Sequence, residues 1–241
     1  MVPGAGALAI VQARMSSTRL PGKSLADVGG EPMLGLLLRR LRRSHEVERI
    51  VVATTTASDD DPIEELAREM GEEAYRGSRD DVLSRFVGAA AGASEVVVRL
   101  TGDCPLIDPD LVDDVIRLYR RTPDCQYASN IEPRTYPDGL DVEVLSHEIL
   151  ERVGAETEDA HDREHVTTAI RRELHRLPSA ALVCEPDLGE LRWTVDTRED
   201  LEFVREVVRR LGLQRHTAGM SEILEVVQRD PSLAEYHGRR G

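Results

Sequence analysis

The sequence has few aromatic residues, and its cysteines do not form a metal-binding or redox motif. Only two Phe, one Trp and five Tyr occur among 241 residues. The core must therefore consist of Val, Leu, Ile and Ala, which suits buried parallel strands flanked by helices. The three cysteines, Cys104, Cys125 and Cys184, are odd in number and lack C-x-x-C spacing. We therefore expect the cysteines to be reduced thiols in a reducing compartment, which predicts a cytoplasmic protein.

Acidic residues outnumber basic ones, 45 to 31. The formal net charge of −14 argues against nucleic acid or an anionic membrane as a partner, because such binding depends on clustered cations. A small anionic ligand fits only if positive charge is gathered locally. The apolar stretch at residues 1–10 has no basic segment before it and runs directly into Arg14, so it is too short for a secretory signal or a membrane span. We expect it to contain the first strand.

Strand-like and helix-like segments alternate along the chain. Apolar runs at 7–12, 50–54, 95–100 and 192–195 have the character of strands. Helix signals predict helices at 32–43, 63–70, 111–119, 155–174, 200–211 and 221–228. This order predicts a single α/β domain over residues 1–241, with a doubly wound, mostly parallel sheet of Rossmann-like type.

The pattern changes between residues 126 and 145. Short alternating runs are interrupted there by turn signals, Glu132-Pro133 and Pro137-Asp138-Gly139. We interpret this region as a small antiparallel excursion, and residues 126–175 or so as an insertion that forms a lid on one side of the site. The sequence has neither an internal repeat nor a linker long enough to separate independent domains.

The main functional signal is a basic loop directly after the first expected strand. Residues 12–23 have the sequence QARMSSTRLPGK. At the carboxyl end of a parallel strand, the N–H groups and hydroxyls of such a loop can converge on phosphate oxygens, while its cations offset the phosphate charge. The loop therefore predicts a polyphosphate site that includes Ala13, Arg14, Ser16, Ser17, Arg19 and Lys23.

This loop has two other interpretations. Gly22-Lys23-Ser24 matches the end of the P-loop of kinases and ATPases. The first glycine of that motif would have to stand where Ser17 is, and Pro21 stiffens the stretch that must wrap a phosphate, so we reject the P-loop. A solvated basic loop is the second alternative. The cations interrupt a strongly acidic chain just after a buried strand, and this context favours the phosphate interpretation.

Two carboxylates are expected at the same edge of the sheet as this loop. Asp103 follows the strand at 95–100, and Asp196 ends the strand at 192–195. Carboxylate oxygens suit Mg²⁺, which keeps several waters and takes further ligands from phosphates. Each residue also has a purely structural interpretation, Asp103 as a turn residue after Gly102 and Asp196 as a helix cap.

Further polar side chains lie in the excursion and after it. Asp141 and Glu143 are two residues apart, so they share one face of an expected strand, either toward a ligand or toward solvent. His161 and His165 are four apart and share a helix face. No third residue has the spacing of a zinc ligand, so a zinc site is disfavoured.

These motifs together resemble one protein family. The runs at 9–25 (AIVQARMSSTRLPGKSL), 99–109 (RLTGDCPLIDP), 136–143 (YPDGLDVE), 163–167 (REHVT) and 192–197 (RWTVDT) resemble the spore coat polysaccharide biosynthesis protein F family. That family is related to the acylneuraminate and KDO cytidylyltransferases. The resemblance runs in order through nearly the whole chain, with a departure at Ser84, where the family pattern has an acidic residue.

The resemblance implies a nucleotide-diphospho-sugar transferase fold and a Mg²⁺-dependent nucleotidyltransferase. The expected reaction moves CMP from CTP to a sugar acid, sugar phosphate or phosphonate-type acceptor and releases pyrophosphate. Carried onto this chain, the resemblance makes Arg14, Lys23, Asp103 and Asp196 catalytic, with Asp103 and Asp196 as metal ligands. It adds nucleotide contacts at Thr54, Arg76, Ser78, Thr101, Gly102 and Asp103, and acceptor contacts on the insertion side at Asp141, Glu143, Arg163 and His165.

Other functions stay open at this point. Guanylyl or other nucleotidyl transfer onto a sugar 1-phosphate would use the same metal geometry, and a non-catalytic nucleotide-sugar binding protein could keep the same fold. A glycosyltransferase is disfavoured because the loop at 14–23 suits a triphosphate donor. We expect a nucleoside triphosphate, with CTP favoured, and a small anionic or sugar-like acceptor as partners. A homodimer is compatible with the sequence.

Overall fold

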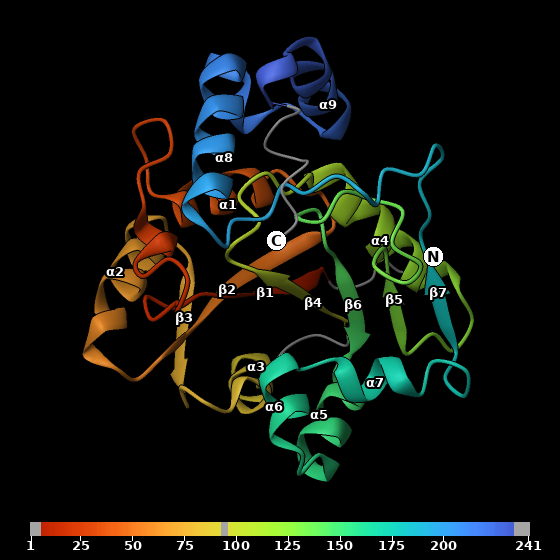
Figure 1. Cartoon of the computed structure of the whole chain (residues 1–241). Coiled ribbons are helices and arrows are strands. Elements are labelled where there is room, and N and C mark those ends of the chain that lie inside the picture. Colours follow the sequence, from red (N-terminus) through yellow and green to blue (C-terminus); the bar gives the residue numbers. More distant parts are fainter. Residues whose placement is uncertain (1–5, 93–95, 234–241) are drawn as a thin grey trace.

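The computed structural model describes residues 6–92 and 96–233. Its centre is a seven-stranded sheet in the order β3-β2-β1-β4-β6-β5-β7 (Figure 1). Only β6 runs antiparallel to its neighbours, β4 and β5, so the predicted mostly parallel sheet with a small antiparallel excursion is confirmed. The strands are β1 (Ala7–Gln12), β2 (Val47–Thr55), β3 (Glu73–Gly77), β4 (Val96–Thr101), β5 (Tyr127–Ser129), β6 (Glu143–Ser146) and β7 (Ser179–Ala181).

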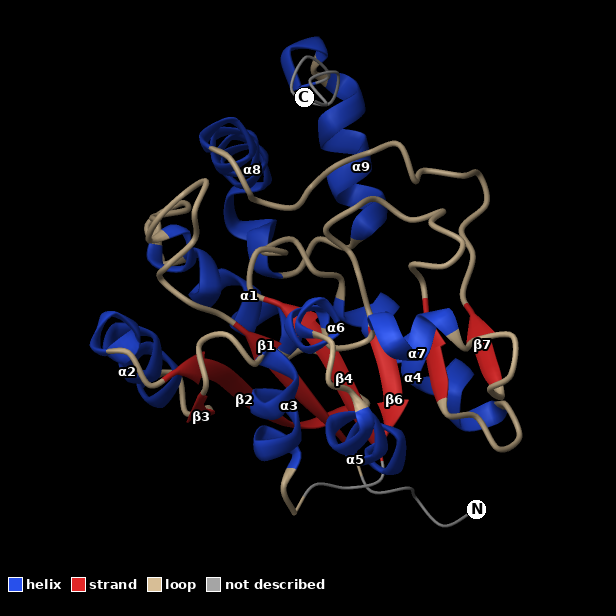
Figure 2. Ribbon diagram, turned by 60° about the horizontal axis from the view of Figure 1, so that its bottom comes forward, coloured by secondary structure: helices blue, strands red, loops and turns tan. Residues whose placement is uncertain are grey.

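Helices cover both faces of this sheet (Figures 1 and 2). The α-helices are α1 (Met33–Leu41), α2 (Asp61–Glu69), α3 (Val82–Ala90), α4 (Pro109–Arg121), α5 (His147–Glu156), α6 (Ala160–His165), α7 (Thr168–Arg172), α8 (Arg198–Leu211) and α9 (Met220–Arg229). Short 3-10 turns are η1 (Lys23–Leu25), η2 (Ser58–Asp60) and η3 (Gly212–His216). In the described part of the chain, none of the helices has both the length and the apolar character needed to cross a membrane.

Strand β1 shows how the sequence builds the two layers. Successive side chains of a strand point to opposite faces. Ala9 and Val11 belong to the core under α1, α2, α4, α8 and α9, whereas Leu8 and Ile10 belong to the core under α3, α5 and α7. Because both faces are covered, every residue from 7 to 11 is buried. The continuous apolar run seen in the sequence is the direct result.

The structure corrects two predicted elements. Residues 192–195 do not form a strand of the sheet, because only Arg192 makes an isolated bridge, to Asp138. The segment runs beside the end of β4, where the Val195 N–H donates to the Asp103 carbonyl at 2.8 Å. Residues 155–174 are not one helix but the end of α5 followed by α6 and α7. The break occurs because Asp159 caps α6 and Val166, at φ 60°, ends it.

Candidate functional site

The basic loop after β1 folds back on itself at the carboxyl edge of the sheet. Gly22 has a φ of 77° and donates its N–H to the Met15 carbonyl at 2.9 Å. Glycine adopts this conformation without a steric cost, so the chain can turn here into η1, which begins with Lys23. The buried Asp60 accepts a hydrogen bond from the Met15 N–H at 2.7 Å. The loop is thereby tied to the segment that follows β2.

Lys23 is the residue that joins the basic loop to the two predicted carboxylates. Its Nζ lies 3.0 Å from Asp103 Oδ2, 3.1 Å from Asp196 Oδ1 and 2.7 Å from the Val195 carbonyl oxygen. It is also the only lysine of the sequence; the other 30 of the 31 Lys and Arg residues are arginines. The loop and the two carboxylates thus meet at one edge of the sheet, as the sequence predicts.

Asp196 is surrounded by cations rather than used as a helix cap. Arg19 and Arg192 lie 3.1 and 2.8 Å from its Oδ2. Burial raises the pKa of Asp196, but the hydrogen bond from Arg192 and the charge of Lys23 outweigh burial, so the pKa is lowered overall. The cap of α8 is Thr197. Asp196 is therefore an ionised carboxylate whose side chain does not cap that helix.

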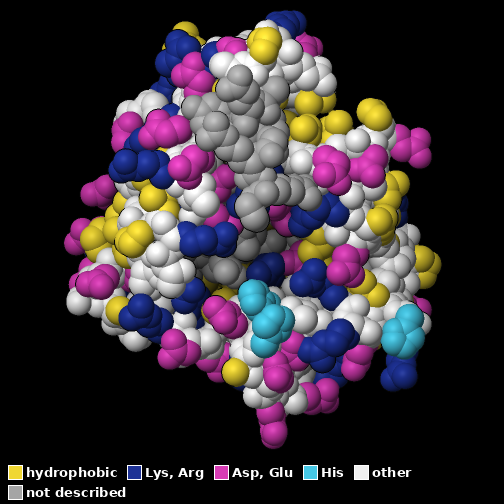
Figure 3. All heavy atoms as spheres, in the orientation of Figure 1, with side chains coloured by type: hydrophobic (Ala, Val, Ile, Leu, Met, Phe, Trp, Pro, Cys, Tyr) yellow, Lys and Arg dark blue, Asp and Glu magenta, His cyan; other side chains and the backbone are white. Residues whose placement is uncertain are grey.

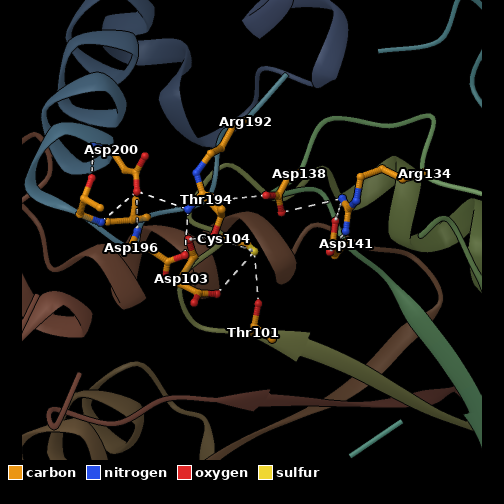
Figure 4. Close-up of polar contacts among 12 residues, drawn as sticks. Thr101, Asp103, Cys104, Arg134, Asp138, Asp141, Arg192, Thr194, Asp196 and Asp200 are labelled. Carbon is orange, nitrogen blue, oxygen red and sulfur yellow. Dashed lines mark hydrogen bonds and ion pairs between the residues drawn. The ribbon is translucent and has the colours of Figure 1, made fainter. Parts of the chain in front are cut away.

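A chain of alternating charges continues from Asp196 toward the antiparallel excursion (Figure 4). Arg192 also lies 2.8 Å from Asp138. Arg134 lies 3.8 Å from Asp138 and forms a bidentate pair with Asp141, with both distances 2.7 Å. Burial, followed by the charge of Asp141, raises the pKa of Asp138. These pairs fix the position of the loop between β5 and β6 relative to Asp196.

Asp103 is held by a close approach of two strand ends. The Gly102 N–H donates to the Gln12 carbonyl at 2.8 Å, and a Cβ at Gly102 would lie 2.8 Å from the same oxygen. Beside it, the Cys104 Sγ lies 3.2 Å from Thr101 Oγ1. Burial, then the charge of Asp103, raises the pKa of the Cys104 thiol well above its usual value. Cys104 is therefore a neutral packing residue beneath the site.

A cavity of about 350 Å³ opens over these residues. Five cationic and three anionic side chains line it, which gives a local positive excess in a chain of net charge −14. Figure 3 shows Lys and Arg side chains around the middle of this face of the molecule. The lining residues with charge are Arg14, Arg19, Lys23, Arg85, Arg99, Asp103, Glu164 and Asp196. Such a cavity suits a small polyanion.

A second cavity, of about 240 Å³, adjoins the first. The two share Arg99, Thr101 and His165 as lining residues. The rest of the second cavity is lined by Ile131, Arg134, Asp141, Glu143 and Arg171. Ligands bound in the two cavities would therefore meet beside Arg99.

Most of the predicted contact residues line one of these cavities. In the first lie Ala13, Arg14, Ser17, Arg19, Lys23, Thr101, Gly102, Asp103 and Asp196. The predicted acceptor residues Asp141, Glu143 and His165 line the second. Outside both linings lie Ser16, Thr54, Arg76, Ser78 and Arg163. The roles of all these residues in binding stay predictions.

Two of the predicted contact arginines form bonds within the fold. Arg76 donates to the Thr55 carbonyl at 2.8 Å and pairs with Glu64 at 2.8 Å. Arg163 pairs with Asp81 at 2.7 Å and so ties α6 to the start of α3. These bonds connect neighbouring elements of the fold.

Glu143 lies in the second cavity but has structural partners. Its side chain is almost fully buried, forms an ion pair with Arg99 and accepts a hydrogen bond from the Tyr127 hydroxyl at 2.6 Å. It begins β6, whereas Asp141 precedes that strand. The strand therefore starts two residues later than the sequence predicts, although both side chains line the second cavity, as expected of residues that share one side. The excursion packs against β4, and this packing buries Glu143.

Several lining residues are not predicted from the sequence. Two of them had a usable signal: Arg99 interrupts an otherwise apolar strand, and Glu164 lies within the family-like run at 163–167. Arg85, Arg134 and Arg171 had none, since their positions relative to the cavities depend on how α3, α7 and the β5–β6 loop pack. Arginine is common on exposed helix and loop surfaces, so the residue type alone carries no information.

The residues present fit a divalent cation. Asp103 Oδ2 and Asp196 Oδ1 both lie next to the Lys23 ammonium, at 3.0 and 3.1 Å, so the two carboxylate oxygens converge on one cation. Hard oxygen donors beside a phosphate-sized cavity are the ligand type that Mg²⁺ prefers. Elsewhere, Asp159, His161 and Asp162 have ligand-type atoms within 4.8 Å of one another. There, however, Asp159 caps α6 and Asp162 pairs with Arg172, so helix capping and ion pairing explain that group.

Comparison with known proteins identifies the family. The sequence model of the family "Cytidylyltransferase" matches residues 8–233 of this chain. The chain belongs to this cytidylyltransferase family. The resemblance seen in the sequence motifs is thereby confirmed.

Two relatives match this cytidylyltransferase-family chain over nearly its whole length. The spore coat polysaccharide biosynthesis protein SpsF of Bacillus subtilis (strain 168) is 34% identical, over 94% of this chain and 96% of that protein. The structure of a cytidylyltransferase from Leptospira borgpetersenii serovar Hardjo-bovis superposes with a TM-score of 0.90 at 32% identity, over 94% of this chain and 95% of that one.

More distant relatives share part of the sequence or only the fold. A 3-deoxy-manno-octulosonate cytidylyltransferase of Geobacter sulfurreducens is 42% identical, but over 45% of this chain and 43% of that protein. The structure of CMP:2-keto-3-deoxy-manno-octonic acid synthetase complexed with CTP superposes with a TM-score of 0.65 at 20% identity, over 86% of this chain and 99% of that one. The latter match shows a common fold.

Proposed function

We propose that this chain is a Mg²⁺-dependent cytidylyltransferase that moves CMP from CTP onto a small acceptor of the sugar acid, sugar phosphate or phosphonate type. The observation that carries the proposal is the meeting of Lys23, Asp103 and Asp196 on the wall of a locally positive cavity. Membership of the family supports it. So does the fold shared with a synthetase that was solved with CTP bound.

The reaction is in-line attack by an acceptor oxygen on the α-phosphorus of CTP. The new bond joins that oxygen to phosphorus, and the bond to the β-phosphate oxygen breaks, so pyrophosphate leaves. Positioning and charge neutralisation supply most of the rate in such a transfer. Arg14, Arg19 and Lys23 line the cavity and would offset the negative charge on the triphosphate and on the leaving group.

Asp103 and Asp196 would hold the metal ion. When bound, Mg²⁺ offsets charge on the phosphates and polarises the α-phosphoryl group. The chain itself keeps Asp196 oriented through Arg192 at 2.8 Å, and Asp200 accepts a hydrogen bond from the Asp196 N–H at 2.8 Å. Outer residues that fix a ligand in this way tune the affinity of a metal site.

The second cavity is where we place the acceptor. It adjoins the nucleotide cavity beside Arg99, and its lining includes Arg134, Arg171 and His165. An acceptor with an anionic carboxylate or phosphate group would meet these donors. If the attacking oxygen is already anionic, the transfer needs no protein base.

The direct test is to measure pyrophosphate release with CTP, GTP, UTP and ATP, each with a panel of sugar acids, sugar phosphates and phosphonates. We expect turnover with CTP, and a fall of roughly 100-fold or more in kcat for Asp103→Asn. Asp114→Asn, which removes an exposed carboxylate on α4 that lines neither cavity, is the matched control and should keep full activity. Preference for GTP would favour the guanylyl-transfer alternative. Nucleotide binding without turnover on any acceptor would favour a binding protein.

The single lysine gives a second test that does not depend on the acceptor. An amine-reactive reagent can modify only Lys23 and the α-amino group. Mg²⁺ with CTP should slow modification of Lys23 while leaving the α-amino group unaffected, as read by peptide mass spectrometry. Equal modification rates with and without CTP and Mg²⁺ would contradict the placement of the triphosphate at Lys23.

A further inference from the structure

Lys23 already uses all of its N–H donors within the protein. An ammonium group has three donors and no acceptor. The Nζ of Lys23 lies 3.0 Å from Asp103 Oδ2, 3.1 Å from Asp196 Oδ1 and 2.7 Å from the Val195 carbonyl oxygen. The side chain is only 12% exposed. In this arrangement Lys23 cannot bind a phosphate without giving up one of these three bonds.

Two of the three acceptors belong to the carboxylates that would hold the metal ion. Among the described residues, Lys23 is the one cation that forms ion pairs with both Asp103 and Asp196. Arg19 and Arg192 pair with Asp196 alone of these two. A divalent cation bound by the same two oxygens would compete with the ammonium for them and would be repelled by its charge at close range. The ammonium and a metal ion therefore exclude one another.

The residue type at this position suits an exchange. Of the 31 Lys and Arg residues, 30 are arginines, and Lys23 is the one lysine. Arginine carries a rigid, flat fork, whereas lysine carries a compact charge on a flexible stem. A compact cation can take the place of a metal ion and leave it by rotation of its stem. The backbone beside it stays fixed, because the Gly22 N–H bonds the Met15 carbonyl at 2.9 Å and the Ser24 hydroxyl bonds the Arg14 carbonyl at 3.1 Å.

We propose that Lys23 and the metal ion exchange places. Lys23 binds the two carboxylates when no metal ion is bound, and its positive charge then offsets their mutual repulsion. Once a metal ion is held by Asp103 and Asp196, the three donors of Lys23 are free for phosphate oxygens. The inference rests on the proposed function, which needs a metal ion at these carboxylates and Lys23 at the triphosphate.

The two carboxylates would keep their positions after the ammonium leaves. Asp196 Oδ2 lies 3.1 Å from Arg19 and 2.8 Å from Arg192 (Figure 4), so the departure frees Oδ1 while Oδ2 stays held. The Val195 N–H donates to the Asp103 carbonyl at 2.8 Å, which joins the two backbone segments that carry the carboxylates. Three oxygens bound the place that the ammonium leaves, and oxygen is the ligand atom that Mg²⁺ prefers.

The first experiment measures the Kd of Mn²⁺ by electron paramagnetic resonance, without nucleotide or acceptor. Mn²⁺ takes the same oxygen ligands as Mg²⁺. Lys23→Met keeps a long, flexible stem but removes the charge, and we expect it to bind Mn²⁺ roughly tenfold or more tightly than the wild type. Arg19→Met is the matched control, because Arg19 also pairs with Asp196 but is 65% exposed. Removal of this screened charge should change the Kd by less than about threefold.

A second measurement uses the wild type and needs no substitution. Mg²⁺ alone, at a concentration above its Kd, should speed the modification of Lys23 by an amine-reactive reagent relative to the α-amino group. The reason is that the ammonium loses its three acceptors and becomes accessible. Addition of CTP should then slow the modification again, because the phosphates bind the released side chain.

Three results would overturn the inference. Mn²⁺ binding in Lys23→Met that is no tighter than in the wild type would mean that the lysine does not compete with the metal. A gain in Arg19→Met as large as that in Lys23→Met would mean that net charge alone sets the affinity. A modification rate of Lys23 that Mg²⁺ alone leaves unchanged would mean that the ammonium stays on the carboxylates. Because none of these measurements includes an acceptor, a failure of the transfer reaction alone would count against the proposed function and leave the exchange standing.

Discussion

The buried ion pair of Glu143 and Arg99 tests what holds strand β6 in the sheet. Glu143 is 1% exposed, pairs with Arg99 and accepts a hydrogen bond from the Tyr127 hydroxyl. Glu143→Gln keeps the shape of the side chain but removes its charge. Arg99 would then be left as a largely buried cation without its counter-ion, and its Nε already lacks a partner. The substitution should therefore act mainly on stability.

The expected loss is about 3 kcal/mol in the free energy of unfolding, the lower part of the range for breaking a buried ion pair, because Gln can still accept a hydrogen bond. For a chain of this length, that loss lowers the melting temperature by about 6–12 °C. The matched control is Glu73→Gln on β3. Glu73 forms a bidentate pair with Arg49, but its side chain is 59% exposed. Exposed pairs contribute below about 1 kcal/mol.

The pH dependence has a definite sign. Burial raises the pKa of Glu143, but the charge of Arg99 and polar neighbours that include the Tyr127 hydroxyl outweigh burial, so the pKa is lowered from its ordinary value of 4.5. A carboxylate with a lower pKa in the folded state stabilises the fold above the unfolded pKa. That contribution is lost as pH falls through the folded value. The difference in the free energy of unfolding between wild type and Glu143→Gln should thus have its full size at neutral pH and become smaller below about pH 4.

Urea denaturation followed by circular dichroism, at pH 7 and at about pH 3, measures this difference in the free energy of unfolding directly. A difference below about 1 kcal/mol at pH 7 would refute the structural role of Glu143. So would a gap that widens on acidification. If Glu143→Gln is as stable as the control but loses acceptor affinity, the original expectation of an acceptor contact is the better account.

Three further predictions concern the frame of the site. Arg163→Lys should cost about 1–2 kcal/mol in the free energy of unfolding, because it loses the pair of hydrogen bonds that Nε and Nη2 donate to Asp81 Oδ2. The pKa of Asp81 is lowered because the Arg163 bonds outweigh burial, so this cost should fade as pH drops below 3.8 in acid titrations of unfolding. Gly139→Ala should cost about 2–3 kcal/mol in thermal unfolding, since φ is +112° and the added Cβ would lie 2.6 Å from the Trp193 carbonyl carbon; an unchanged melting temperature would contradict this. Cys104, whose pKa burial raises well above its usual value, should resist iodoacetamide at pH 8 in the native protein and react after denaturation, as read by mass spectrometry.

The sequence predicted those helices and strands that are determined by residues close together in the chain. The bounds of β1 follow from one continuous apolar run, and the start of α4 follows from Asp108 as cap and Pro109 in the first turn. The meeting of the basic loop with Asp103 was predicted for the right reason, because the carboxyl ends of parallel strands share one edge. The position of Asp196 was predicted from a strand that does not form, and the segment beside the end of β4 places it instead. Elements stabilised by distant partners were missed or misplaced, as with β7 and residues 192–195.

The sequence by itself determined which polar groups follow the first strand and the fourth: three cations and a glycine turn in the basic loop, and a carboxylate at Asp103. Only the tertiary structure decided which arginines line a cavity. Arg40 and Arg85 both lie in helices, yet packing surrounds Arg40 with four backbone carbonyls and places Arg85 in the wall of the first cavity. Likewise, Glu143 is buried by the packing of β6 against β4 and meets Arg99 across 44 positions of sequence. Burial and pairing of this kind depend on long-range packing, which no local pattern of residues records.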